Sequence, residues 1–556
     1  MKIPQQQTLF KKVSLLFLFA CFLFLLFEYA TNFSFFYLTQ NLYQPQDLKG
    51  AAKVGAYAFS YFFVLLNLLL LVLLRKGKLF VLFFSVIVLT MMLDTTYYFN
   101  GLSRGFSTGQ FVTAVNEKKH ALDAISTFYG GAIKGLILLV IFIAVSWLLR
   151  KTYASRFFFL PILFLPLSFI GSNLILKDTD YETYDYPSFV KVPLSIFNAY
   201  DDGLMDIPFV KRDRVVATPT SNPHFKNIIL LVDESVRGDY LSINGYPKKT
   251  TEYLSSLDKL FTLGSISSVA NSSANSNYIL RNGITLEELP DKEYKTLKKP
   301  SIFQYAKKAG FKTIFLDAQS NYQGLQNNMS SYDLEDIDFF ITQRNKDDYS
   351  LSDRRITKQL SKILADNSKD KFFVYFVKYG SHFKWQLNYP KENETFKPAL
   401  TIYEALGFDN REKAVNSYLN SVKWGVDGYF EYLLKTIDTK DTLIIHTADH
   451  GQNIIENEIL VTHGTAKNPP STMANVPLLI YANDIDYIKS KFDKIELDTY
   501  SQYQLFPSLL DIMGYNEETV GQYGSPFWKG NKKERRFYSG SIFGKGYSNK
   551  YQMKAN

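Results

Sequence analysis

Residues 225–246, FKNIILLVDESVRGDYLSINGY, join an apolar run to a polar turn, and this stretch decides the fold. The run from Phe225 to Val232 is mostly apolar, which is typical of a strand buried on both faces of a parallel sheet. It leads directly into Asp233-Glu234-Ser235. Because ligands of parallel α/β sheets bind beyond the carboxyl ends of the strands, we expect the chemistry of the chain at such turns.

Similar apolar runs alternate with helical patterns through the rest of the chain. Strands are predicted at Phe225–Val232, Thr313–Leu316, Phe372–Val377, Thr442–His446 and Pro477–Tyr481. Helices are predicted at Ser301–Ala309, Asp353–Ala365, Arg411–Ile437 and Tyr500–Met513. This alternation predicts an α/β domain with a central, mostly parallel sheet between helices.

Three of the six histidines follow predicted strands. They lie in the segments Gly380-Ser381-His382, Asp449-His450-Gly451 and Thr462-His463-Gly464, which join Glu234 as candidate site residues. Imidazole and carboxylate groups from several loops are ligands of divalent metals, so the pattern predicts a metal site. A single histidine is more often solvated or packed. That interpretation applies to His120 and His224, and to His446, which is expected to pack within its strand.

A serine hydroxyl is the candidate reacting group. The chain has one cysteine, Cys21, inside an apolar run, which excludes an intramolecular disulfide, cysteine-ligated zinc and an iron–sulfur cluster. A hydroxyl at a helix start could meet a phosphate held by backbone N–H groups. Residues 267–280, SSVANSSANSNYIL, offer several serines before a predicted helix. Composition does not choose among them, and a helix-capping loop is the alternative.

The N-terminal part contains apolar runs long enough to cross a bilayer, which takes roughly 20 residues. Five such runs lie at Val13–Tyr29, Val54–Leu74, Leu79–Tyr98, Ala132–Leu149 and Phe157–Leu176. Lysines and arginines between them predict a cytoplasmic N-terminus and an outer C-terminal part. The predicted organisation is a five-helix transmembrane domain over residues 1–176, a connector over 177–223 and a periplasmic catalytic domain over 224–556.

The formal net charge of +9 agrees with this membrane orientation. Basic residues lie beside the apolar runs and form no long run of their own, so no nucleic acid is expected. The outer loop at 100–131 carries Asn116 and Glu117, which are candidates to hold a lipid headgroup. A solvated loop is the alternative for these two residues.

Several motifs together resemble the phosphoethanolamine transferases of the alkaline phosphatase superfamily, a group that includes enzymes that modify lipid A. The motifs are ESVRGDYLSINGY at 234–246, DHG at 449–451 and HG at 463–464. The family's nucleophile is a threonine at a helix start, followed three positions later by serine. Ser273 and Ser276 match that spacing, which favours Ser273 over Ser272 as the nucleophile.

The resemblance also implies ligands and substrate contacts. Zinc, as one ion or two, would be bound by Glu234, Ser273, Asp449 and His450. The candidate catalytic and substrate-binding histidines are His382 and His463, which would contact the transferred phosphate or a second zinc. Gln319 and Gln323 would face the substrate.

The chain departs from the family pattern at three points. Gln323 stands where the family has a lysine, Val377 stands where it has a further histidine, and the disulfides of its lipid A-modifying members are missing. The resemblance therefore implies the metal chemistry and leaves the acceptor open.

The implied reaction is zinc-dependent transfer of phosphoethanolamine from phosphatidylethanolamine, through a phosphorylated Ser273, to a cell-envelope glycan or lipid such as lipopolysaccharide. The expected protein is a monomer in the bacterial inner membrane. The alternatives are phosphoglycerol transfer from phosphatidylglycerol and a non-enzymatic membrane protein with a degenerate hydrolase domain. A formylglycine sulfatase is disfavoured, because Ser273 lacks the Ser-x-Pro/Ala-x-Arg pattern.

Overall fold

A computed structural model describes residues 210–319, 325, 327–342, 348–401, 404, 408–456, 462–464, 468–529, 535–543 and 548–553, together with helix α8 (Ser188–Asp201) and scattered positions between 18 and 147. The chain divides into two compact units, Met1–Asp206 and Ile207–Asn556. Among the described residues, no helix is long and apolar enough to cross a membrane. The five predicted spans lie largely outside the described residues, and Asn116 and Glu117 lie entirely outside them.

In the first unit, α8 is held by a buried ion pair. The Nζ atom of Lys191 lies 3.0 Å from a carboxylate oxygen of Asp94, and both side chains are fully buried. The boundary between the two units falls within the segment predicted as a connector, part of which forms α8.

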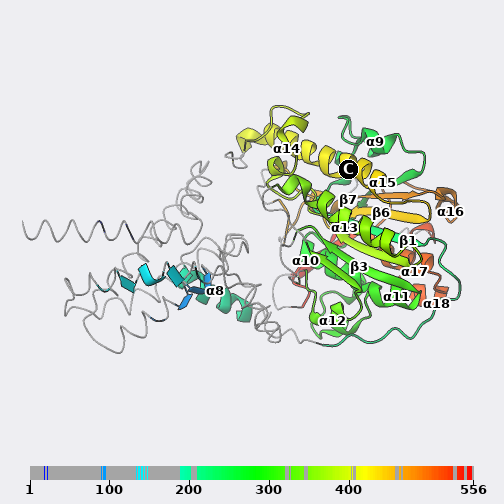
Figure 1. Cartoon of the computed structure of the whole chain (residues 1–556), viewed down its shortest axis with the longest axis horizontal. Coiled ribbons are helices and arrows are strands. Elements are labelled where there is room, and N and C mark those ends of the chain that lie inside the picture. Colours follow the sequence, from blue (N-terminus) through cyan, green and yellow to red (C-terminus); the bar gives the residue numbers. More distant parts are fainter. Residues whose placement is uncertain are drawn as a thin grey trace, which may run out of the picture. The chain divides into compact units, whose positions relative to one another are not determined.

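The second unit is built on a seven-stranded sheet with the order β2-β7-β6-β1-β5-β3-β4 (Figure 1). The strands are β1 (Asn227–Asp233), β2 (Leu260–Ser267), β3 (Phe311–Asp317), β4 (Phe339–Thr342), β5 (Lys371–Val377), β6 (Thr442–Ala448) and β7 (Asn475–Ala482). β7 runs antiparallel to its neighbours β6 and β2, and the other paired strands run parallel. The predicted α/β domain with a mostly parallel sheet is therefore confirmed.

Two side chains of β5 identify the helices that cover each face of the sheet. Phe376 packs against Tyr429 of α15 (Gly428–Thr436). Tyr375 points to the opposite face, where its ring contacts Phe303 of α11 (Ile302–Lys308) and its hydroxyl donates a hydrogen bond to Asn277 of α10 (Ser273–Asn282). Successive strand residues alternate between the faces, so α15 and α10 lie on opposite sides of the sheet (Figure 1).

Other helices extend these two layers. α13 (Ser352–Asp366) packs on α15, and α17 (Leu505–Ile512) packs on α10. The remaining elements are α9 (Glu252–Ser255), α12 (Ser331–Leu334), α14 (Arg411–Val422), α16 (Ile485–Lys489), α18 (Glu517–Gly521) and a separate hairpin of β8 (Arg536–Gly540) and β9 (Ser548–Gln552).

Two predicted helices differ in detail from the structure. The predicted helix at Arg411–Ile437 is continuous, but a π-helical segment at Lys423–Asp427 separates α14 from α15. The helix predicted from Tyr500 begins only at Leu505. The delay arises because Ser501 caps a 3₁₀ turn at Gln502–Gln504, in a capping box with Gln504.

Strand β1 lies at the centre of the sheet, between β5 and β6. Val232 is opposite Val377 of β5, and Asp233 is opposite Ala448 of β6. The segments that follow these three parallel strands therefore leave the sheet side by side, at its carboxyl edge.

Two glycines with positive φ provide a test of the packing around α10. Gly283 ends α10 at a φ of 57°, and a Cβ there would lie 2.5 Å from a ring atom of Tyr523 and 2.7 Å from one of Phe506. Gly310 has a φ of 84° with no atom within 4 Å of its Cβ position. We expect G310A to lower the free energy of unfolding by about 1 to 2 kcal/mol, because only the backbone is strained. G283A should cost roughly 1 to 3 kcal/mol more through overpacking. Equal losses in denaturant unfolding would contradict this packing.

Candidate active site

Two buried carboxylates lie at the ends of adjacent strands. Glu234 follows β1 and Asp449 follows β6, and both are 1% exposed. The Oδ1 atom of Asp449 accepts hydrogen bonds from the backbone N–H groups of Ser235 at 3.1 Å and His450 at 2.8 Å. These bonds orient the carboxylate, and its buried Oδ2 atom accepts no hydrogen bond from any described part of the chain.

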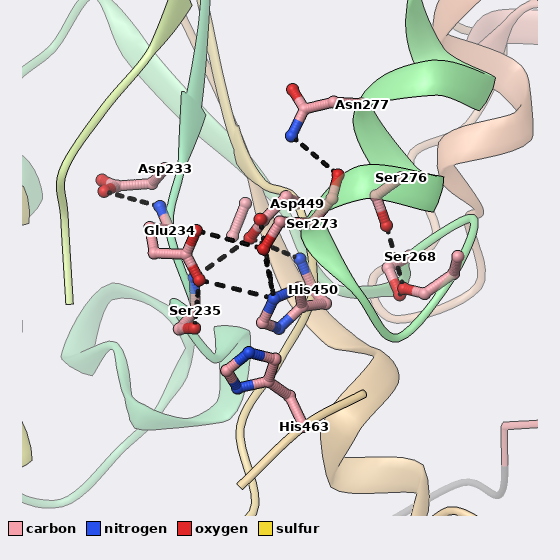
Figure 2. Close-up of polar contacts among 12 residues, drawn as sticks. Asp233, Glu234, Ser235, Ser268, Ser273, Ser276, Asn277, Asp449, His450 and His463 are labelled. Carbon is pink, nitrogen blue, oxygen red and sulfur yellow. Dashed lines mark hydrogen bonds and ion pairs between the residues drawn. The ribbon is translucent and has the colours of Figure 1, made fainter. Parts of the chain in front are cut away.

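The imidazole of His450 faces these carboxylates through its Nε2 atom (Figure 2). Its Nδ1 atom lies 2.7 Å from the carbonyl oxygen of Gly451. Because a carbonyl oxygen only accepts, Nδ1 is protonated and donates a hydrogen bond to it. Nε2 lies 3.4 Å from Oε1 of Glu234 and 3.5 Å from Oδ2 of Asp449. The backbone contact thus directs the second ring nitrogen toward both acids.

Ser273 joins this cluster from helix α10, whereas the two carboxylates follow strands of the sheet (Figure 2). It is the first residue of α10, and Ser272 is the N-cap. The Oγ atom of Ser273 lies 3.1 Å from Nε2 of His450 and 3.3 Å from Oε2 of Glu234. Its side chain is half-buried, so it stays accessible, and it lies where the N–H groups of a helix start can receive an anion.

His463 stacks on His450, with ring centroids 4.3 Å apart. Ligand atoms of Glu234, His450 and His463 lie within 4.8 Å of one another. The segment around His463 is held on both sides. Gly464 and Asn271 exchange two hydrogen bonds, and the backbone N–H of Asn453 donates to the carbonyl oxygen of Thr462.

Of the other predicted site residues, Gln319 contacts Glu234, His382 is exposed, and three lie outside the described residues. His382 is exposed, and its Nδ1 atom lies 2.5 Å from the carbonyl oxygen of Phe383. The amide nitrogen of Gln319 donates to Oε2 of Glu234 at 2.9 Å and to the carbonyl oxygen of Lys378 at 2.8 Å. Gln323 lies outside the described residues, as do Asn116 and Glu117.

The remaining histidines mostly follow expectation. His446 packs edge-on against Phe430, and in addition its Nε2 atom lies 2.9 Å from Asp233. His224 is partly exposed near Asp484, and His120 lies outside the described residues.

Burial and charge together set the protonation of the site. Burial and the nearby charge of Glu234 raise the pKa of Asp449 to about 7. Burial lowers the pKa of His450, but the charges of Asp449 and Glu234 outweigh it and raise that pKa to about 9. Burial and the charge of His450 lower the pKa of His463 to about 3. Although burial opposes ionisation of Glu234, the hydrogen bond and charge of His450 hold its pKa well below the usual range.

The donor atoms fit a divalent cation. Four donors bound in a tetrahedron at about 2.0 to 2.1 Å from zinc stand roughly 3.3 Å apart. Four of the six separations among Ser273, Glu234, Asp449 and His450 are quoted above and run from 3.1 to 3.5 Å, with Ser273 and His450 facing different oxygens of Glu234. A cation would also bind Oδ2 of Asp449, which accepts no hydrogen bond from the residues that the structure describes.

Two further residues support this cluster and were not predicted from the sequence. Ser235 has a φ of 60°, and its Oγ atom donates to Oε1 of Glu234 at 2.6 Å. The hydroxyl of Tyr418 donates to the carbonyl oxygen of Ser235 and accepts from the N–H of Arg237, both at 2.8 Å. The position of Ser235 directly after Glu234 was a usable signal. No local pattern points to Tyr418, which lies 183 residues further along the chain.

The fold and the site define a class of α/β proteins that gather carboxylate and imidazole groups around a hydroxyl at the carboxyl edge of a parallel sheet. The sequence model of the sulfatase family, described as Sulfatase, matches residues 226–515, which is 290 of the 556 residues. The chain belongs to the sulfatase family.

Similar proteins with assigned names are phosphoethanolamine transferases, which are enzymes. The Kdo(2)-lipid A phosphoethanolamine 7''-transferase of Salmonella typhimurium is 27% identical over 46% of this chain and 44% of its own length. Phosphoethanolamine transferase EptC of Escherichia coli is 24% identical over 47% of this chain and 45% of its own length. The chain thus spans less than half the length of these relatives.

A solved structure of the C-terminal periplasmic domain of Escherichia coli EptC, in complex with Zn, is also similar. It is 17% identical to this chain and superposes with a TM-score of 0.49, covering 60% of this chain and 95% of that domain.

We expect zinc binding at this site to release a proton. With a pKa of about 9, His450 is protonated at pH 7 in the metal-free protein, and a cation must displace that proton. The apparent zinc affinity should therefore rise at least about tenfold per pH unit between pH 7 and 8.5, most steeply near pH 7, where Asp449 also has a proton to lose. Titration calorimetry in buffers of different ionisation enthalpy measures the proton count directly. An affinity independent of pH, or the same proton release from H450A, would contradict this electrostatic description.

Proposed function

We propose that the protein transfers phosphoethanolamine from phosphatidylethanolamine to a hydroxyl or phosphate of a cell-envelope glycan or lipid, such as lipopolysaccharide, by way of a phosphorylated Ser273. The observation that carries the proposal is the position of the Ser273 Oγ atom. It lies at the start of α10, 3.1 Å from His450 and 3.3 Å from Glu234, among donors spaced for a metal ion.

Glu234, Asp449 and His450 are the proposed ligands of zinc, with Ser273 completing the set. When bound, zinc would lower the pKa of the serine hydroxyl and offset negative charge that develops on the phosphoryl oxygens. His463 has its pKa lowered to about 3 and is neutral at pH 7, so its ring is free to bind a second cation.

The proposed reaction has two displacements. In the first, the Ser273 hydroxyl gives up its proton to solvent, its oxygen forms a bond to phosphorus, and the bond from phosphorus to the glycerol oxygen breaks. Diacylglycerol leaves after its oxygen takes a proton, for which exposed His382 is the candidate donor. In the second, an acceptor group loses its proton to a base, its oxygen forms a bond to phosphorus, and the serine oxygen leaves phosphorus and takes up a proton. Such a sequence gives ping-pong kinetics.

The membrane assignment belongs to the same proposal. Five spans before the catalytic domain would hold the enzyme in the bacterial inner membrane, with the site on the periplasmic side. A donor lipid and a membrane-bound enzyme meet more often than two dissolved molecules, which supports the choice of a phospholipid donor. The names of the similar proteins support phosphoethanolamine as the transferred group and lipid A as one acceptor class.

Alanine variants of two neighbouring serines distinguish a nucleophile from a residue that only begins the helix. S273A should lower the transfer rate by about 10³-fold or more, because Ser273 carries the one hydroxyl in contact with His450 among the residues that the structure describes. S272A is the matched control. The Ser272 side chain makes no cap hydrogen bond, so transfer should stay within a few-fold of the parent rate. Full loss of transfer in S272A with activity retained in S273A would overturn the assignment.

The donor can be identified on the enzyme itself. Membranes containing the full-length chain are incubated with headgroup-labelled phosphatidylethanolamine or phosphatidylglycerol, and the label on Ser273 is located by peptide mass spectrometry. We expect a phosphoethanolamine adduct on Ser273 and none in S273A. A phosphoglycerol adduct instead would change the proposed substrate, and no adduct from either lipid would contradict the covalent step.

A further inference from the structure

A cluster of charged side chains lies in the protein interior beside Glu234, and none of its members is a proposed ligand. Asp233, Lys378 and His446 are all fully buried. The Nζ atom of Lys378 lies 2.5 Å from Oδ2 of Asp233, and the Nε2 atom of His446 lies 2.9 Å from the same oxygen. Asp233 points away from the group formed by Ser273, Asp449 and His450 (Figure 2).

Lys378 is bound on every side. Besides Asp233, its ammonium group donates to the carbonyl oxygen of Gly425 at 2.7 Å and lies 3.7 Å from Asp353. It also lies 4.1 Å from the centre of the Tyr429 ring. Gly425 belongs to the π-helical segment Lys423–Asp427, and such segments occur often at functional sites. The lysine therefore ties the end of β5 to β1 and to the helix layer.

Stability alone is a weak reason for such a pair. Removing two charges from water is costly, and apolar replacements of buried pairs are often neutral or stabilising. Asp233 and Lys378 are nevertheless fully buried with their charged groups 2.5 Å apart, and His446 contacts the same carboxylate oxygen.

Both members of the pair contact the residues that hold Glu234. The Oδ1 atom of Asp233 accepts the backbone N–H of Glu234 at 3.2 Å. The carbonyl oxygen of Lys378 accepts the amide of Gln319, which donates its other hydrogen to Oε2 of Glu234. Three residues after Lys378, the N–H of Ser381 donates to the carbonyl oxygen of Glu234 at 3.0 Å. The side chain of Asp233 therefore holds the backbone of Glu234 directly, and the segment that begins at Lys378 holds its carbonyl oxygen and, through Gln319, its carboxylate.

We propose that Asp233 and Lys378 are positioning residues, which set the orientation of the Glu234 carboxylate for its metal ion and hold the segment that leads to His382. The inference rests on the proposed metal site, and it predicts that the pair governs metal affinity more than folding. Partners behind a metal ligand typically change affinity by about 10 to 100-fold when they are replaced.

The test compares two matched double variants of the full-length chain. D233N/K378M removes both charges of the pair and keeps the shapes. Asp353 loses the ammonium group at 3.7 Å but keeps its hydrogen bonds from the N–H groups of Tyr379 and Gly380. R212M/D333N makes the same kind of change at a second buried pair, in which Nε of Arg212 lies 2.6 Å from Asp333, outside the site. Zinc affinity is measured by competition with a chelator, and the unfolding midpoint is measured on the metal-free protein.

We expect D233N/K378M to bind zinc at least tenfold more weakly than the parent, while its metal-free unfolding midpoint changes no more than that of R212M/D333N. The control should keep parental zinc affinity. Parental affinity in D233N/K378M would overturn the inference, and so would an equal loss of affinity in the control. If D233N/K378M does not fold, the single variants K378R and D233N are compared instead. K378R keeps the positive charge, so it should bind zinc more tightly than D233N, and equal zinc affinity of the two would overturn the inference. Absence of zinc binding by the parent chain would instead overturn the proposed function.

Discussion

The site depends on one electrostatic constraint, which is the burial of two carboxylates at neighbouring strand ends. Glu234 and Asp449 are each 1% exposed, and their proximity helps to raise the pKa of Asp449 to about 7. Such an arrangement favours either a neutral carboxyl group or a compensating positive charge. Without a metal, protonated His450 supplies that charge. A divalent cation would supply it better, because it would also bind Oδ2 of Asp449, which accepts no hydrogen bond from the described residues.

The fold meets this constraint through strand order. Placing β1 between β5 and β6 brings three strand ends together, although these strands are far apart in the sequence. Glu234, Asp449 and His450 are buried there, whereas Ser273 comes from α10 and is half-buried. Rigid ligands and an accessible hydroxyl therefore come from different elements. This division suits the proposed function, in which rigid ligands hold a metal ion while a lipid headgroup reaches the serine.

Sequence reasoning predicted the parts of this site that depend on strand ends. One apolar run ends just before Asp233 and Glu234, and another ends shortly before Asp449 and His450. These are local patterns, and the parallel sheet brings the residues themselves together. The choice of Ser273 over Ser272 came only from a family resemblance, because composition does not distinguish them. The partners of Asp233 were out of reach for a physical reason: whether a side chain at a strand end turns toward the site or the interior depends on distant residues such as Lys378. The π-helical segment left no signal, since it continues a helical pattern without a break.

The central claim is that a metal ion lies between Glu234, Asp449 and His450 and activates the hydroxyl of Ser273. Anomalous X-ray diffraction at the zinc edge, from crystals of the zinc-loaded full-length chain, locates the ion directly. The account predicts a peak about 2.0 to 2.2 Å from carboxylate oxygens of both acids and from Nε2 of His450. A peak elsewhere, or a zinc-loaded crystal with Ser273 Oγ directed away from the ion and out of its reach, would contradict it.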